Sequence, residues 1–257
     1  MQVRDEMSTD LLTVGREDTL REAARRMSER GVGAAIVDPG TAGSRPGIVT
    51  EWDVLRSVGA GKDPDSERVA DYSTPDAVSV PPDSSLEQAA ETMAHGGFRH
   101  LLVADEDELV GVVAMRDIVH RWTRQRALPG WGMPIRDAMD TDVLTLGLED
   151  TLREATRQMS EQGMGAVVVE PAKAGRPPGI ITMREVLHSV GAGQDPDAER
   201  VADHLAPAMT FSAPGWSLSQ AAEAMTKGGF QHIVVVDESG TVGIISMRNL
   251  VRSLTSQ

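Results

Sequence analysis

The sequence predicts a mixed α/β (α+β) protein built from four copies of one β-α-β-β-α unit. Residues 47–71 and 179–203 lie 132 positions apart and are identical at 18 of 25 positions. Each half is itself doubled at a spacing of 66, because the apolar positions of one amphipathic helix recur there. These positions are Leu20, Ala23, Ala24 and Met27, then Leu86, Ala89, Ala90 and Met93. Self-similarity at a fixed spacing indicates a repeated structural unit.

Every unit has the same order of predicted elements. The first strands are expected at residues 11–14, 77–80, 143–146 and 209–212. A helix follows, with apolar residues at i, i+3, i+4 and i+7, and we expect it to stop at Gly31, Gly96, Gly163 and Gly228. Two aliphatic strands come next, at 34–37 and 48–49, 101–103 and 112–113, 166–169 and 180–181, and 233–236 and 244–245. A second helix begins directly after them. Short aliphatic strands of this kind are typical of a sheet covered by helices.

Composition narrows the class of protein. Hydrophobic residues make up 40% of the 257 residues and aromatic residues only 3%, so the core must be aliphatic. The absence of cysteine excludes disulfides and thiolate metal sites and fits a reducing compartment, so we expect a cytoplasmic protein. No apolar run approaches the roughly 20 residues of a membrane helix. The net charge of −14 disfavours a nucleic-acid partner, because an acidic surface repels phosphate backbones.

The repeats suggest a division into two halves. Residues 124–134, with a tryptophan, two prolines and two glycines close together, have little periodicity and are predicted to be a linker. The first half then covers residues 1–123, with units at about 1–62 and 67–123. The second half covers residues 135–257, with units at about 135–194 and 199–257.

Two local sequence patterns, together with the repeated order of strands and helices, resemble those of a known family. A Gly-aliphatic-aliphatic-Thr-x-x-Asp junction joins strand to helix at Gly47–Asp53, and an Arg-His-aliphatic strand occurs at Arg99–Val103. A variant of that strand recurs at Gln231–Val235. In four copies, these features resemble the CBS domain, named from cystathionine beta-synthase. The resemblance implies two pseudo-twofold pairs of motifs, called Bateman modules. It also implies a disc of four motifs, closed within a monomer or formed by a homodimer.

The resemblance also implies a ligand. CBS pairs bind adenosine-containing molecules such as AMP, ADP, ATP, NAD or S-adenosylmethionine in the cleft between the two motifs, as regulatory ligands rather than catalytic cofactors. The junction acid holds the ribose hydroxyls, and the Ser/Thr lies near ribose or phosphate. The candidate ligand-binding residues are Thr13, Thr50, Trp52, Asp53, Arg99, His100, Arg116, Asp117, Thr145, Thr182, Arg184, Glu185, His232, Ser246, Arg248 and Asn249.

Each candidate also has a structural interpretation. Ser/Thr-x-x-acid is a capping box, in which the acid reaches back to the start of the helix. Arg116, Arg184 and Arg248 could neutralise a phosphate or could be surface residues of a first helical turn. His100 and His232 begin equivalent strands, where they either contact ligand or pack half-buried. The histidines show no metal-ligand spacing.

The junctions are unequal, and this inequality favours the first pair as the sensing half. Their acid position holds Asp53, Asp117, Glu185 and Asn249 in turn, and only the first junction has the full pattern. No motif for a nucleophile, base or metal lies outside the repeats, so we expect no enzyme. We expect a sensor that transmits ligand binding to an unknown protein partner. The alternative is a protein-interaction module whose clefts hold no ligand.

Overall fold

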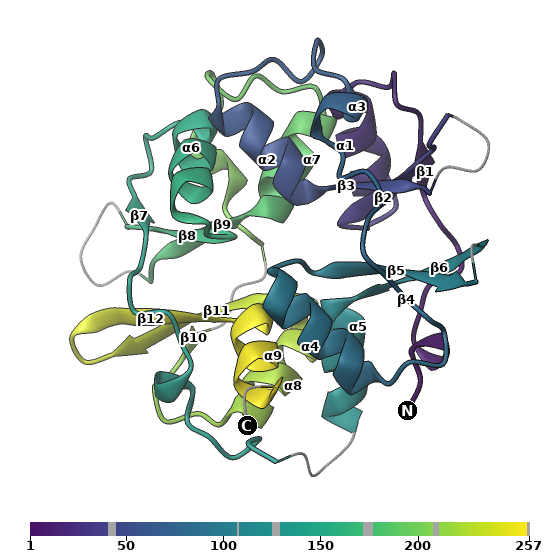
Figure 1. Ribbon diagram of the computed structural model, residues 1–257. Helices are drawn as coiled ribbons and strands as arrows, with labels where there is room; N and C mark the ends of the chain where they lie inside the picture. The colour runs from purple at the N-terminus through teal and green to yellow at the C-terminus, as the bar shows by residue number, and fades with distance from the viewer. Residues whose placement is uncertain (41–44, 107, 125–128, 172–176, 208–210, 256–257) are drawn as a thin grey trace. The chain divides into compact units, whose positions relative to one another are not determined.

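The structure is a computed structural model (Figure 1) that describes residues 1–40, 45–106, 108–124, 129–171, 177–207 and 211–255. Met209, in the first strand predicted for the fourth motif, lies outside these ranges. The first motif comprises β1 (Thr13–Val14), α1 (Leu20–Glu29), β2 (Ala34–Val37), β3 (Gly47–Thr50) and α2 (Glu51–Gly59). The third comprises β7 (Thr145–Leu146), α6 (Leu152–Gln162), β8 (Ala166–Val169), β9 (Gly179–Thr182) and α7 (Met183–Gly191).

The even-numbered motifs have the same order with longer hairpins. The second comprises β4 (Ser79–Val80), α4 (Leu86–Gly96), β5 (His100–Asp105), β6 (Glu108–Ala114) and α5 (Met115–Arg124). The fourth comprises β10 (Phe211–Ser212), α8 (Leu218–Gly228), β11 (His232–Asp237), β12 (Gly240–Ser246) and α9 (Met247–Thr255). Short helical turns precede or follow the motifs at η1 (Val3–Asp5), α3 (Val69–Tyr72), η2 (Ile135–Asp137) and η3 (Val201–His204). The predicted four-motif mixed fold is therefore confirmed.

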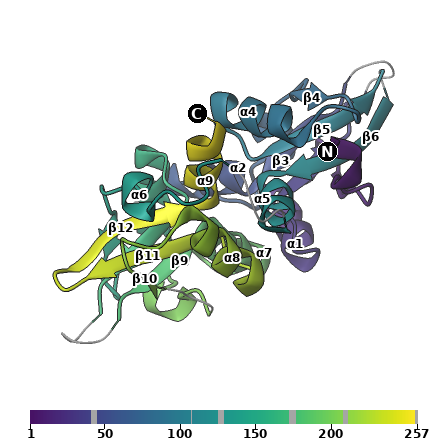
Figure 2. The same ribbon diagram turned by 90° about the horizontal axis from the view of Figure 1, so that it is seen from below.

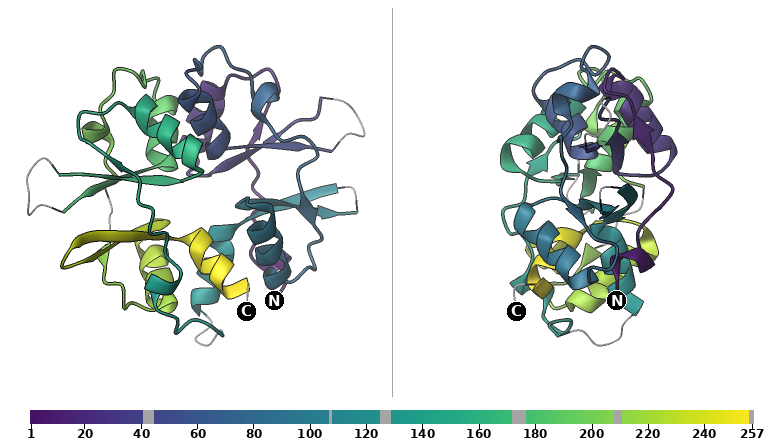
Figure 3. Two further views of the ribbon diagram at one scale, coloured as in Figure 1. Left: turned by 60° about the vertical axis from the view of Figure 1, so that its left-hand side comes forward. Right: turned by 45° about the vertical axis from the view of Figure 1, so that its right-hand side comes forward.

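Each motif is a three-stranded sheet covered on one face by its two helices (Figure 1). The first strand pairs parallel to the second, and the second pairs antiparallel to the third. The β11–β12 hairpin, with α8 and α9 on one face, can be followed in Figures 2 and 3. The first strands β1, β4 and β7 are shorter than predicted, since only two residues of each form ladder pairs.

Helix ends mostly follow the sequence signals. Thr19 and Thr151 cap α1 and α6, each accepting the amide of the residue three positions on at 3.1 Å. Gly163 is the left-handed C-cap of α6, as expected. Helices α4 and α8 end at Gly96 and Gly228, as expected, and their left-handed C-caps are the next residues, Gly97 and Gly229, with φ of 72° and 69°.

Contacts divide the chain into two compact units, and each unit combines one motif from the first half of the chain with one motif from the second half. The odd-motif unit comprises Leu11–Ala77 and Leu144–Pro207 and holds the first and third motifs. The even-motif unit comprises Met1–Asp10, Val78–Val143 and Ala208–Gln257. The N-terminal turn belongs to the even-motif unit because the Val3 amide donates to the Ser84 carbonyl at 2.8 Å. The predicted modules 1–123 and 135–257 with their linker at 124–134 stay a prediction.

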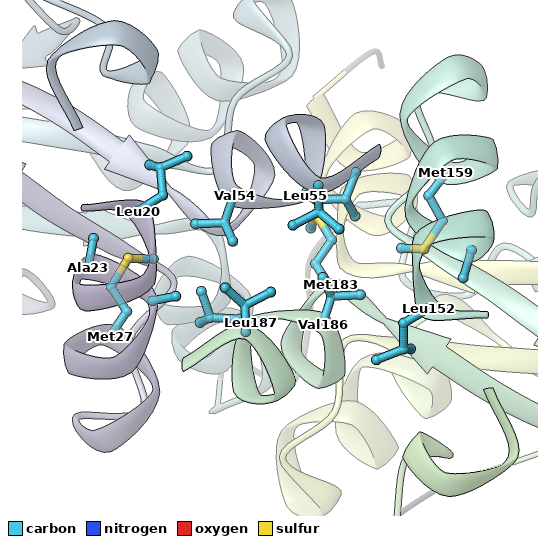
Figure 4. Close-up of a cluster of buried hydrophobic side chains, with 14 of the residues drawn as sticks. Leu20, Ala23, Met27, Val54, Leu55, Leu152, Met159, Met183, Val186 and Leu187 are labelled. Carbon is cyan, nitrogen blue, oxygen red and sulfur yellow. The ribbon is translucent and has the colours of Figure 1, made fainter. Parts of the chain in front are cut away.

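The core of the odd-motif unit is aliphatic and is shared by the first and third motifs (Figure 4). Helix α1 packs on α7, and α2 packs on α6. The labelled side chains of Figure 4 are Leu20, Ala23, Met27, Val54, Leu55, Leu152, Met159, Met183, Val186 and Leu187. All ten are buried. The repeated methionines are therefore core residues, which suits their flexible, gap-filling side chains.

Glycine allows the helix ends of the odd-motif unit to approach the facing helix closely. A Cβ atom on Gly59 would lie 2.8 Å from the Thr156 carbonyl oxygen. A Cβ atom on Gly191 would lie 2.8 Å from the Cα atom of Arg25. Both distances are shorter than a van der Waals contact, and both involve backbone atoms that cannot rotate away. Any larger residue at either position must therefore push two helices apart.

Two arginines clamp the same helix ends. Arg21 of α1 donates from Nη1 to the carbonyl of Val190 at 2.6 Å, near the end of α7. Arg153 of α6 donates to the carbonyl of Val58 at 2.6 Å, near the end of α2. The Nε atoms of these arginines bind Asp65 at 2.7 Å and Asp197 at 2.6 Å. Cations at helix C-termini satisfy free carbonyls and complement the helix dipole.

The close helix contact predicts the effect of a single methyl group. Gly59→Ala should lower the free energy of unfolding by about 1–3 kcal/mol, the usual cost of overpacking, although alanine is the better helix former. Urea unfolding measures this change. Gly215→Ala is the matched control, because a Cβ atom there meets nothing within 4 Å. Equal stability of the two variants would show that the contact at Gly59 yields without cost.

Candidate functional site

The candidate site is the strand-to-helix junction, which has one geometry in all four motifs. The third strand ends at Thr50, Ala114, Thr182 or Ser246, and the second helix begins at the next residue. The side chain three positions on turns back and accepts the backbone amide of that last strand residue. The N···O distances are 2.8 Å to Asp53, 2.9 Å to Asp117, 3.0 Å to Glu185 and 2.8 Å to Asn249. The capping-box interpretation is confirmed for Thr50 and Thr182.

Asp53 has the most enclosed carboxylate of the four positions. Its residue is only 7% exposed. The hydroxyl of Thr50 donates to Oδ2 at 2.8 Å, in addition to the amide. Burial raises the pKa of the Asp53 carboxyl, and the hydrogen bonds from Thr50 oppose this rise. Within the described residues no hydrogen bond is recorded for Oδ1, so one carboxylate oxygen keeps its accepting capacity.

Asp117 keeps the carboxylate but lacks the hydroxyl partner. Ala114 offers only its amide, and the Nε atom of Arg116 lies 3.7 Å from Oδ1. Burial raises the pKa of Asp117, against the opposing effects of the Ala114 amide and Arg116. The second junction is therefore a charged site with fewer internal hydrogen bonds than the first.

The remaining junctions differ in reach and charge. Glu185 accepts the Thr182 hydroxyl at 2.5 Å, but its longer side chain is half-buried. Asn249 accepts the Ser246 hydroxyl at 2.5 Å and is 1% exposed. An amide oxygen can replace the carboxylate as a cap, because capping needs only an acceptor. The fourth junction therefore keeps the local fold without the charge.

The residues just before the acid position have different surroundings. Arg248 donates from Nη2 to the carbonyl of Gly97, the C-cap of α4, at 3.2 Å. Burial lowers the pKa of Arg248, and its Nε atom has no partner among the described residues. Arg184 is exposed, and Trp52 packs against the core of the odd-motif unit. Arg248 therefore contributes a helix cap.

The two histidines lie beside the junctions of their own motifs. His100 pairs with Ala114 across the β5–β6 ladder, and His232 pairs with Ser246 across β11–β12. Burial, together with the charges of Arg99 and Arg116, lowers the pKa of His100 to about 3, so the imidazole is neutral at pH 7. The equivalent residues of the odd-numbered motifs are alanines, at Ala34 and Ala166.

Thr13 and Thr145 are not brought beside the junction residues of their own motifs. Both are exposed on the first strand, where Thr13 pairs with Ile36 and Thr145 with Val168. Ile36 in turn pairs with Ile48, two residues before Thr50. These threonines therefore lie one strand and two positions away from the capping hydroxyls.

A pocket that the sequence did not predict lies where β2 ends and β3 begins, at the end of the β1–β3 sheet away from Thr50. It has a volume of about 640 Å³, and its lining includes Arg16, Arg45, Ser73 and Asp76. The signal available in the sequence was a break in the repeat, because Arg16 and Ser73 correspond to Leu148 and Leu205 at the spacing of 132.

Two other kinds of site are absent from the part of the chain that the structure describes. No group of three His, Asp or Glu side chains there is placed to hold a metal ion. None of the helices in the described ranges has the length and apolar character needed to traverse a bilayer.

The fold and junctions define a protein of four tandem β-α-β-β-α motifs. The sequence model of the CBS domain matches residues 3–60, 69–123, 135–192 and 207–256. The chain therefore belongs to the CBS domain family.

Relatives match all or part of this chain. The CBS domain-containing protein YhcV of Bacillus subtilis is 36% identical over 118 residues, 45% of this chain and 81% of that protein. Protein MJ1225 of Methanocaldococcus jannaschii is 28% identical over 194 residues, 72% of this chain and 68% of that protein. Its crystal structure, described as that of a proposed archaeal homologue of g-AMPK, covers 98% of this chain and 99% of its own with a TM-score of 0.81 and 19% identity.

A second structure supports the same fold. An uncharacterised conserved protein of Pyrococcus horikoshii covers 99% of this chain and 100% of its own, with a TM-score of 0.65 and 18% identity. At these identities, both structural matches establish the fold of the whole chain rather than its ligand.

The buried carboxylate predicts that Asp53→Asn gains stability relative to the wild type as pH rises. The variant keeps the helix cap in the form that Asn249 already has. Because the pKa of Asp53 is raised in the folded state, its favourable contribution is complete below the unfolded pKa and is lost as pH rises through the folded pKa. Stability of the variant relative to wild type should therefore increase from about pH 4 to about pH 7.

Urea unfolding at several pH values checks this prediction. Asp53→Ala is the matched control, because it removes the acceptor as well as the charge and should be less stable than Asp53→Asn throughout. A relative stability of Asp53→Asn that falls with rising pH would contradict the assigned direction of the pKa shift.

Proposed function

We propose that this protein is a regulatory sensor that binds an adenosine-containing ligand at its strand-to-helix junctions. Binding causes a conformational change that is passed to a protein partner. The observation that carries the proposal is the Asp53 carboxylate, held in place through Oδ2 with its Oδ1 atom left without a recorded bond in the described chain. We place the protein in the cytoplasm, as a monomer of four motifs or as a homodimer, without a catalytic role.

The geometry of Asp53 suits a ribose. A cis-diol offers two hydroxyl donors to one carboxylate, and hydrogen bonds to a charged acceptor are the stronger kind. Thr50 fixes the side chain before ligand arrives, so less conformational freedom is lost on binding. Burial strengthens the interaction further because the local dielectric is low.

The junction series ranks the four sites. Asp53 has charge and a fixed orientation, and Asp117 has charge with fewer internal bonds. Glu185 reaches further from the helix, and Asn249 carries no charge. We therefore propose the first two junctions as the main ligand sites and the last two as weaker or altered ones.

The relatives support an adenine nucleotide in particular. Protein MJ1225, which shares the four-motif fold, is described as a proposed homologue of g-AMPK. We accordingly propose AMP, ADP or ATP as the first ligands to test, followed by NAD and S-adenosylmethionine. Ligand can shift a conformational equilibrium only by its differential affinity for the two states, so a partner must contact a surface that differs between them.

A second candidate is a protein-interaction module without ligand. The observation in its favour is that all four acid-position side chains already serve as helix caps. Under this alternative the carboxylates are retained for folding alone.

Ligand binding by wild type and Asp53→Asn separates these functions. AMP at 100 times its dissociation constant should stabilise the wild-type protein by about 2.7 kcal/mol, visible as a thermal shift. Asp53→Asn should bind AMP about 10-fold more weakly in calorimetric titration, because a charged acceptor is lost while the cap remains. Asp71→Asn, at an exposed position of α3, is the control and should bind as wild type.

Two results would overturn the proposal. Unchanged AMP affinity in Asp53→Asn and in Asp53→Ala would remove the ribose role. No thermal shift with AMP, ADP, ATP, NAD, S-adenosylmethionine or cyclic dinucleotides would favour the interaction module.

A further inference from the structure

A pocket of about 640 Å³ lies at the edge of the β1–β3 sheet opposite the Thr50 junction. Val37 ends β2 and Gly47 begins β3 at this edge, and both line the pocket. Its polar lining comes from Arg16 after β1, from Arg45 and from the segment that follows α3. The lining residues that the structure describes all belong to the odd-motif unit and lie between residues 16 and 76, in one motif and the segment that follows it.

Backbone contacts hold the segment that forms one wall. The amide of Ile48 donates to the Thr74 carbonyl at 3.0 Å, and the amide of Thr74 donates to the Ile48 carbonyl at 2.9 Å. This pairing brings the Thr74 oxygen to 2.9 Å from the place of a Cβ on Gly47, so only glycine fits there. Asp76 then adopts a left-handed backbone, with φ of 46°. The wall is thus a defined turn.

Two polar groups of the pocket lining retain binding capacity. No hydrogen bond or ion pair is recorded within the described residues for the Arg16 guanidinium or for the Ser73 hydroxyl. Arg45 adds a second guanidinium to the lining, and Asp76 adds a carboxylate. Arginine presents several donors in a planar fork that matches phosphate oxygens. In a chain with a net charge of −14, two arginines at one pocket are a local exception.

The third motif shows what the same scaffold looks like without this pocket chemistry. At the spacing of 132, Leu148 replaces Arg16, Pro177 replaces Arg45 and Leu205 replaces Ser73. The Cδ2 atom of Leu205 lies 2.7 Å from the place of a Cβ on Gly179, and Leu148 and Leu205 pack against the core. In the third motif, leucine side chains therefore cover the position that polar groups line in the first motif. The polar lining is a property of this motif rather than of the fold.

We propose that this pocket binds a phosphate monoester that carries hydroxyl groups, of the sugar-phosphate class. Arg16 and Arg45 bind the phosphate, Ser73 donates to it, and Asp76 accepts hydroxyl hydrogens. The volume is in the range of small-molecule sites, which is about 300–1,000 Å³. The site is distinct from the junction of the proposed function, because Gly47 and Thr50 are at opposite ends of β3.

Calorimetric titration of the full chain at low ionic strength tests the proposal with glucose 6-phosphate as the probe and glucose as the uncharged control. Glucose 6-phosphate should bind the wild type and glucose should not. Arg16→Gln should weaken binding about 10-fold, since one guanidinium contact to phosphate is lost. Arg4→Gln, at an exposed position of the even-motif unit, makes the same charge change and should bind as wild type.

A double variant gives an independent arm. Arg16→Leu with Ser73→Leu installs the residues that the third motif already carries, so the fold should tolerate it, and it should abolish binding of glucose 6-phosphate. The failure of this proposal is distinguishable from failure of the junction proposal through Asp53→Asn, which should bind glucose 6-phosphate as wild type. Absence of binding to the wild type at about 10 mM probe, or equal affinities of Arg16→Gln and Arg4→Gln, would overturn the pocket assignment.

Discussion

The odd-motif unit depends on the close contact of two helix ends with the helices that face them. Gly59 and Gly191 let α2 and α7 reach the backbones of α6 and α1, and this closeness brings Arg21 and Arg153 within 2.6 Å of the helix-end carbonyls. The glycines and the arginines therefore work together. The even-motif unit has Thr123 and Thr255 in place of these glycines, at the equivalent positions of α5 and α9. Its core also includes the large side chain of Trp122.

A scaffold that folds by repeated contacts leaves positions outside those contacts free to diverge. The residues that pack α1 on α7 have their counterparts in α6 on α2, so a change in one copy upsets a shared core. The junction acids and the pocket arginines bear no such constraint, because a cap needs only an acceptor and the pocket edge needs only to be covered or solvated. Asn249 and Leu205 show both substitutions already accommodated within this chain.

The sequence predicted the elements better than their pairing in space. Strand, helix and junction positions follow from periodicity and capping signals, which act over a few residues. Which motifs share a core does not follow, because four similar units present four similar apolar faces. The C-cap at Gly97 does not follow from the sequence either, since adjacent glycines are equivalent in sequence and only the left-handed φ distinguishes Gly97 from Gly96. The pocket was not predicted, because its lining residues are not adjacent in the sequence and only the fold brings them together.

Capping and ligand binding can share one carboxylate because they use different oxygens. At Asp53 the amide and hydroxyl of Thr50 both donate to Oδ2, and burial raises the carboxyl pKa. A buried anion with unused accepting capacity is costly, and a ligand hydroxyl that donates to it removes part of that cost. Asn249 caps its helix without the charge and so has no such cost to recover. Under the proposed function, the unequal junctions therefore couple ligand affinity to local stability, strongly at the first motif and weakly at the fourth.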